Sequence, residues 1–165
     1  MCIRDRPLYG LESRRLLADF DLIGFSLPYE QLYTNMLNML DLAGLPLLAA
    51  DRGEGQPLVV AGGGAVFNPE PMAAFVDLFV LGDGEEAVVD ITAALRRSRQ
   101  QGEGREALLR RLAGIPGVYV PRFYDVRYHD DGTLAGVTAT TSAARLPVRQ
   151  RLAADLPPPR PRPRV

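Results

Sequence analysis

Residues 57–71 read PLVVAGGGAVFNPEP, a short apolar run that ends in three glycines and continues into Asn-Pro-Glu-Pro. The run LVVA predicts a buried β-strand, and the glycines predict a tight turn where that strand ends. Asn68 is a favoured N-cap residue and Pro69 a favoured first helical residue, so we expect a short helix over residues 72–76. Consecutive glycines also allow another group to approach the backbone closely. The stretch therefore predicts a strand-to-helix turn with a close-approach surface beside it.

Strands and helices alternate on both sides of this stretch. Apolar, β-branched runs predict two more buried strands, over residues 20–27 and 78–81, and a shorter strand is expected over residues 45–50. Apolar residues at helical spacing predict three longer helices, over residues 29–43, 85–101 and 105–113. In the second of these, the residues expected to face the core are Val88, Ile91, Thr92 and Leu95. Alternation of this kind predicts an α/β domain with a parallel sheet.

The chain changes character after residue 116. Residues 118–129 alternate like a strand interrupted by Pro121, Asp-Asp-Gly predicts a hairpin turn, and the following residues predict the return strand. The tail LPPPRPRPRV predicts an extended linker. The opening MCIRDR matches the translation of a sequencing adaptor, and we interpret it as an artefact. These features divide the chain into an artefact, an α/β domain, a hairpin extension and a Pro/Arg-rich linker, over residues 1–6, 7–116, 117–150 and 151–165.

Composition excludes several classes of function. The 165 residues carry a net charge of −1, so no basic field favours nucleic acid. All 19 basic residues are arginine, which excludes a P-loop lysine, a Schiff-base lysine and a lysine general base. One cysteine and one histidine cannot build a disulfide, a cysteine-rich zinc site or an iron–sulfur cluster. No apolar run approaches the ~18 residues of a membrane span. We therefore expect a cytoplasmic location with no membrane partner.

Three loops are expected to meet at one edge of the sheet, because ligands of parallel α/β sheets bind beyond the carboxyl ends of the strands. They follow the three predicted strands and read FSLPY, AGGGAVFNPEP and LGDGEE. The glycine spacing lacks the third glycine of a dinucleotide fingerprint, so that interpretation is rejected. Asp83, Glu85 and Glu86 fit a helix start without any chemistry. His129 lies beside the hairpin turn and is expected to be an exposed surface residue. From the residues alone, a bound ligand and a simple tight turn remain equally open.

The blocks PLYGLESRRLLADFDLIGFSLPYEQLYTNMLNMLDLAG, PLVVAGGGAVFNPEP, LGDGEE and IPGVYVPRFY together closely resemble the N-terminal part of a radical S-adenosylmethionine (radical SAM) protein family. Members of that family carry a cobalamin-binding-like N-terminal domain fused to a radical SAM domain. The resemblance extends from residue 7 to about residue 155. It implies a Rossmann-like, flavodoxin-type domain over residues 7–116 that lacks its first strand. It also implies a corrin-facing surface, formed by Ser26, Gly62, Gly63, Gly64, Gly82, Asp83, Gly84 and Glu85.

The sequence departs from the family pattern in two ways. It has no DxHxxG motif, so a corrinoid would bind without a histidine ligand to cobalt. It also has no CxxxCxxC motif, so the [4Fe–4S] cluster and S-adenosylmethionine would be bound only by a downstream radical SAM domain. The chain is then expected to be a non-catalytic accessory domain whose partner is that domain and whose full-length parent is an enzyme. Two alternatives stay open, a cofactor-free docking module and a free-standing small-ligand-binding domain. A missing first strand would expose a sheet edge and make the isolated chain poorly soluble.

Overall fold

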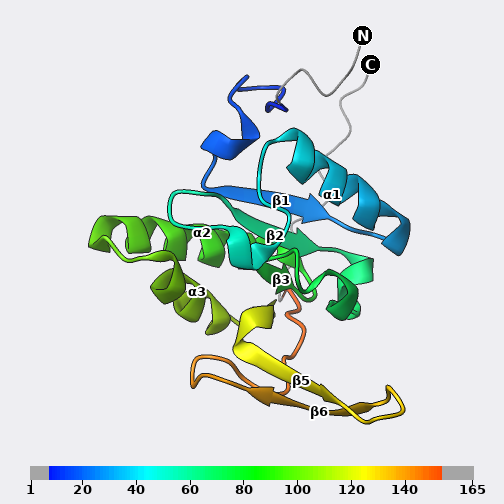
Figure 1. Ribbon diagram of the computed structural model, residues 1–165. Coiled ribbons are helices and arrows are strands. Elements are labelled where there is room, and N and C mark those ends of the chain that lie inside the picture. Colours follow the sequence, from blue (N-terminus) through cyan, green and yellow to red (C-terminus); the bar gives the residue numbers. More distant parts are fainter. Residues whose placement is uncertain (1–7, 154–165) are drawn as a thin grey trace, which may run out of the picture.

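A four-stranded sheet forms the centre of the computed structural model, which describes residues 8–153 (Figure 1). Its strands are β1 (Leu22–Ser26), β2 (Leu58–Gly62), β3 (Leu78–Val80) and β4 (Val118–Tyr119), in the order β1-β2-β3-β4. The pairs β1–β2 and β2–β3 are parallel, which confirms the predicted α/β class, whereas β4 pairs antiparallel with β3. The proposed artefact at residues 1–6 and the linker beyond residue 153 lie outside the described residues.

The core is densest at β2, because this strand is covered on both faces. Consecutive side chains of a strand point to opposite faces, and all four residues of the LVVA run are buried. In β1, by contrast, Ile23 is buried but Gly24 and Ser26 are exposed, so the expectation that this strand is buried on both faces was wrong. The reason is its place at the edge, since β1 pairs only with β2 in the described part of the chain.

Three α-helices pack with the sheet as predicted, with refined bounds. They are α1 (Tyr33–Leu42), which follows a 3₁₀ turn, α2 (Gly84–Gln101) and α3 (Arg105–Ala113). Gly102 ends α2 in the left-handed conformation, at φ 63°. The buried stripe of α2 is Ala87, Ile91, Ala94 and Ser98. Val88 is exposed, so its predicted inward position was wrong. The small side chains of the two alanines and the serine let α2 pack closely, a face that a search for large apolar residues overlooks. None of the helices in residues 8–153 is long and apolar enough to cross a membrane.

Two predicted short elements are absent from the described chain. The expected helix over residues 72–76 is replaced by the 3₁₀ turns η5 (Gly64–Phe67) and η6 (Glu70–Met72), and Asn68 makes no capping hydrogen bond. Two prolines, Pro69 and Pro71, fall within this short crossover, and Pro71 has no amide to donate to the side chain of Asn68 three residues before it. The expected strand over residues 45–50 forms no sheet pairing either. There the backbone amide of Ala49 donates to Ala74 instead, at 2.8 Å.

The predicted hairpin lies apart from the main sheet. It consists of β5 (Tyr124–Tyr128) and β6 (Leu134–Ala139), which pair antiparallel with a register shift near Arg127. Figure 1 shows this two-stranded ribbon at the opposite end of the molecule from α1. Gly132 in the turn adopts φ 81°, as the Asp-Asp-Gly pattern predicts. The 3₁₀ turn η7 (Pro121–Phe123) separates β4 from β5, which confirms the interruption predicted at Pro121.

A buried ionic cluster lies at the end of the sheet opposite to the glycine loops. The carboxylate of Asp77, whose side chain is 1% exposed, accepts hydrogen bonds from Arg52 Nε at 3.1 Å and Arg105 Nη2 at 2.9 Å. It also accepts from the backbone amide of Val59 at 2.8 Å. Burial lowers the pKa of Arg52 from its ordinary value, and the neighbouring Asp77 opposes that shift. The cluster therefore joins β2, β3 and α3 through one carboxylate.

Candidate functional site at the carboxyl edge of the sheet

The three predicted loops do meet at one edge of the sheet. Ser26, the last residue of β1, lies opposite Gly62 at the end of β2, and Gly62 lies opposite Val80 at the end of β3. The loop after β3 begins at Gly82 and leads directly into α2. Parallel pairing aligns the strand ends, so the residues predicted to face a corrin come from neighbouring loops.

The glycine loop packs against the chain that follows β1. Gly63 adopts φ 105°, and a Cβ added to it would lie 2.8 Å from the carbonyl oxygen of Leu27. A Cβ on Gly64 would lie 2.9 Å from the carbonyl oxygen of Pro28. The backbone amide of Leu27 donates to Gly62 at 2.7 Å, and the amide of Ala65 donates back to Leu27 at 2.9 Å. Gly63 and Gly64 are therefore required by the chain's own backbone.

The loop after β3 holds a distant part of the chain in the same way. Arg151 forms an isolated parallel bridge with Gly82, which adopts φ 97°. Its backbone amide donates to Leu81 at 2.9 Å, and its carbonyl oxygen accepts from the amide of Asp83 at 2.8 Å. A Cβ on Gly82 would overlap that carbonyl oxygen, and a Cβ on Gly117 would lie 2.9 Å from the Cβ of Arg151. Only glycine at these two positions leaves room for Arg151.

Charge completes the attachment of Arg151. Its guanidinium donates to Glu86 through Nη2 at 2.7 Å and to Asp90 through Nη1 at 2.6 Å. These two carboxylates lie one turn apart on α2, and their hydrogen bonds raise the pKa of Arg151, Asp90 contributing most. The Arg151 side chain is 17% exposed. We call the residues that hold Arg151 the Arg151 seat, and they are Leu81, Gly82, Asp83, Glu86, Asp90 and Gly117.

The predicted acidic residues have structural partners or remain free in solvent. Asp83 occupies the N-cap position of α2, but its carboxylate accepts from the backbone amide of Ala153 at 2.8 Å. Glu85 is exposed in the first turn of α2, where the helix dipole favours a carboxylate. Asp83 therefore extends the Arg151 seat to the residues that leave the domain.

Part of the predicted surface remains open. A Cβ on Gly84 would meet nothing within 4 Å, and a Cβ on Gly62 would make only ordinary contact with Val80 at 3.8 Å. Ser26 is exposed beside them. Large apolar side chains follow each of the three parallel strands and are 52% to 63% exposed. We call this group the apolar edge, and its members are Tyr29, Phe67, Val88 and Val89.

The described residues offer no protein-based metal centre at this edge. Within residues 8–153, no group of three or more His, Cys, Asp or Glu side chains could hold a metal ion. His129 lies in the β5–β6 hairpin, where its backbone amide donates to Thr133 at 2.8 Å. It is exposed, as predicted, and lies far along the chain from the glycine loops.

Fold and site together define a class: an α/β domain whose carboxyl edge seats a later segment of its own chain. The chain belongs to a known family, because the family model described as "Radical SAM proteins, N-terminal" matches residues 1–121. No curated protein and no solved structure matches the chain. Membership makes the chain an accessory N-terminal domain of a radical SAM protein, and it implies a radical SAM domain in the full-length protein.

Sequence reasoning missed the Arg151 seat. Gly82 was singled out, but its partner was not, because Arg151 stands in an Arg-rich tail about 70 residues further along the chain. One signal was present in the sequence. Glu86 and Asp90 are like charges at i and i+4 on a predicted helix, an arrangement that is unfavourable unless a cation from elsewhere lies between them.

Proposed function

We propose that this domain docks its carboxyl edge on the radical SAM domain and fixes the point at which the chain leaves toward it. The observation that carries this proposal is the packing of Arg151 on Gly82, which no residue with a Cβ at position 82 would permit. Arg151 and Ala153 are held at the end of β3, so the last described residues lie at the edge where the three loops meet.

The apolar edge supports the same proposal. Each of its members is more than half exposed, and one or more follow each parallel strand. Exposed apolar side chains that cluster at one end of a domain are typical of an interaction surface. Leu152, next to Arg151, is also 67% exposed at this edge. A domain that continues from Ala153 is thereby held close to an apolar surface that it can cover.

The test compares Gly82→Ala with Gly84→Ala in the full-length protein. We expect Gly82→Ala to displace Arg151, because the new Cβ would overlap its carbonyl oxygen, whereas Gly84 has open space. Trypsin should then cleave at Arg149 and Arg151 much faster in Gly82→Ala and at the wild-type rate in Gly84→Ala. If Gly82→Ala fails to fold, the double variant Glu86→Gln, Asp90→Asn removes only the charges that hold Arg151.

Hydrogen exchange at Tyr29 and Phe67 reports docking in the same samples. We expect exchange there to rise when Arg151 is displaced, since the neighbouring domain would lose its fixed position. Displacement of Arg151 with unchanged exchange at both loops would contradict the docking function.

A corrinoid without a histidine ligand is the second candidate function. The open space at Gly84 and the ordinary contact at Gly62 favour it, since a flat macrocycle could lie on them beside Tyr29 and Phe67. Ser26 and Glu85 would flank such a ligand. The test adds hydroxocobalamin to the full-length protein and measures visible absorbance after desalting. Retained absorbance that disappears in Gly84→Leu would support this candidate, and no retained absorbance in the wild type would exclude it.

A further inference from the structure

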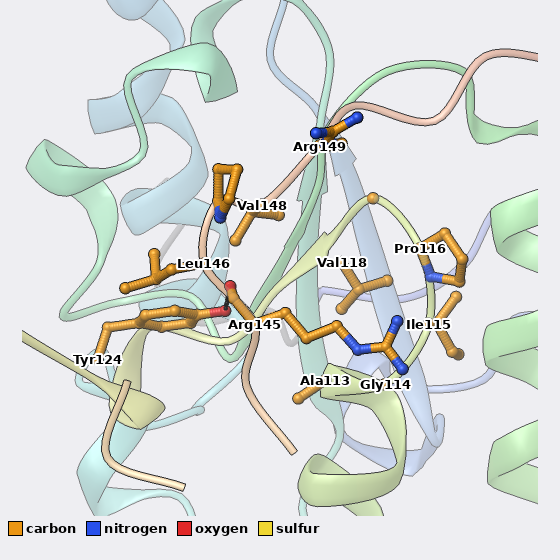
Figure 2. A pocket seen from close by; sticks show the side chains of 12 residues that line it. Ala113, Gly114, Ile115, Pro116, Val118, Tyr124, Arg145, Leu146, Val148 and Arg149 are labelled. Carbon is orange, nitrogen blue, oxygen red and sulfur yellow. Dashed lines mark hydrogen bonds between the residues drawn. The ribbon is translucent and has the colours of Figure 1, made fainter. Parts of the chain in front are cut away.

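A second concave site lies where the loop before β4 faces the segment that leads to Arg151. The end of α3 and the loop Gly114–Val118 form one wall, and residues 145–149 form the other, enclosing a cavity of about 370 Å³. Figure 2 shows side chains from both walls directed into this space. The volume lies in the range of small-molecule sites, which is roughly 300–1,000 Å³. None of the residues predicted from the sequence to bind a ligand lines it.

Four large apolar side chains contribute to the walls of the cavity. Ile115 and Val118 come from the loop and β4, and Leu146 and Val148 from the returning segment. The ring of Tyr124 closes one end, and its hydroxyl donates to the carbonyl oxygen of Arg145 at 2.9 Å (Figure 2). That hydrogen bond fixes the returning segment against β5. Such walls would take up the apolar body of a ligand.

Two arginines supply all of the formal charge in the lining. Arg145 extends across the cavity toward Gly114, and Arg149 lies at its other end (Figure 2). No acidic residue lines the cavity, and neither arginine forms a salt bridge within residues 8–153. A guanidinium presents several donors in a plane that matches a carboxylate. The cavity therefore combines apolar side chains with two exposed arginines that have no acidic partner in the described chain.

We propose that this cavity binds a small organic carboxylate with an apolar body, such as an aromatic or branched aliphatic acid. The carboxylate would pair with Arg145, which crosses the cavity, and Arg149 would add positive charge at the other end. The apolar body would lie among Ile115, Val118 and Leu146. Neither the docking function nor a corrinoid is required for this site. It is nevertheless connected to the Arg151 seat, because residues 145–149 lead into Arg151 and Gly117 belongs to both sites.

Calorimetric titration of the full-length protein tests the proposal with three probes. We expect 2-naphthoate to bind, and 2-naphthamide and inorganic phosphate to bind at least about tenfold more weakly, because one lacks the charge and the other the apolar body. Equal affinity for phosphate and naphthoate would show an unspecific anion contact and overturn the proposal. Absence of naphthoate binding at millimolar concentration would overturn it as well.

Variants assign the binding to this cavity. Arg145→Gln should weaken naphthoate binding about tenfold, as expected for loss of a charge-assisted hydrogen bond, and Arg149→Gln should weaken it less, because only a more distant positive charge is removed. Leu146→Trp should fill the cavity from its exposed wall and abolish binding. Arg127→Gln, on β5 and outside the lining, is the matched control and should bind like the wild type. Undiminished binding in both arginine variants would place the ligand elsewhere and contradict the proposal.

Discussion

Asp77 holds two arginines in the interior of the domain, and no other acidic residue is buried in the described chain. We predict that Asp77→Asn lowers the free energy of unfolding by about 3–5 kcal/mol, because Arg52 and Arg105 would keep their charges without a counter-ion. Urea unfolding followed by circular dichroism measures the change. Asp41→Asn on exposed α1 is the control and should change stability by less than about 0.5 kcal/mol. If Asp77→Asn lowers the free energy of unfolding no more than the control does, the ion pairs of Asp77 with Arg52 and Arg105 do not stabilise the domain.

At the scale of single residues, the sequence shows where the backbone must allow another group to approach closely. It does not show which group approaches. Three consecutive glycines indicated close approach, which the structure shows at Gly63 and Gly64 but not at Gly62. What approaches Gly63 and Gly64 is the backbone of Leu27 and Pro28, a contact made by any loop of suitable path. A corrin and a backbone segment need the same empty space, so spacing alone could not distinguish them. Arg151 was not predicted, because its partner residues lie far away in the chain and the like charges of Glu86 and Asp90 indicate a missing cation without identifying it.

Strand β4 is tied to the crossover after β2 by one side-chain hydrogen bond. The Tyr119 hydroxyl donates to Glu70 Oε1 at 2.8 Å, and burial, followed by that carboxylate, raises the pKa of Tyr119 above its ordinary value of 10.0. Below pH 10 the tyrosine is protonated in both the folded and unfolded states. Above pH 10 the unfolded state loses its proton first, so the free energy of unfolding should fall as the pH rises.

The variant Tyr119→Phe tests the hydrogen bond between Tyr119 and Glu70. It should be about 1 kcal/mol less stable than wild type at neutral pH, because the bond to Glu70 is lost. Above pH 10 its free energy of unfolding should fall less steeply than that of the wild type, because the variant lacks the tyrosine whose pKa is raised in the folded state. Urea unfolding at a series of pH values gives both quantities. Tyr128→Phe, on the exposed end of β5, removes one tyrosine at a different place and serves as control. A Tyr119→Phe profile parallel to wild type would contradict the assignment.

At the scale of elements, periodicity predicted the long segments and failed on short ones. The three parallel strands, α2, α3 and the hairpin were predicted correctly, because each carries a sustained apolar pattern or a specific turn sequence. The crossover between β2 and β3 was predicted as a helix from Asn68 and Pro69, but Pro71 removes one of the two amides that a cap at Asn68 would use, and a 3₁₀ turn forms instead. The antiparallel pairing of β4 depends on contacts with β3 across more than one helix, which no local pattern encodes.

At the scale of the whole molecule, the apolar edge is one of several places where the described residues expose large apolar side chains, and others lie near Leu11 and in the β5–β6 hairpin. We predict that the isolated 165-residue chain self-associates, because the apolar edge and the open side of β1 have no cover within the described residues. The double variant Phe67→Ser, Val88→Ser should shift the chain toward monomer in analytical ultracentrifugation. The control Tyr128→Ser removes an equally exposed side chain from the hairpin and should leave association unchanged. A monomeric wild-type chain at high concentration would contradict this prediction.

The Arg151 seat also has a consequence for modular rearrangement of such proteins. Since the chain is held through Ala153, a spacer inserted after that residue would lengthen the tether without moving its origin. A chimera joined after Ala153 would inherit the native departure point for any foreign domain. A junction placed before Leu146 would remove Arg151 from the chimera, and the attached domain would then have no fixed position relative to this one. The boundary that matters for recombining this module therefore follows Arg151 rather than the end of the sheet.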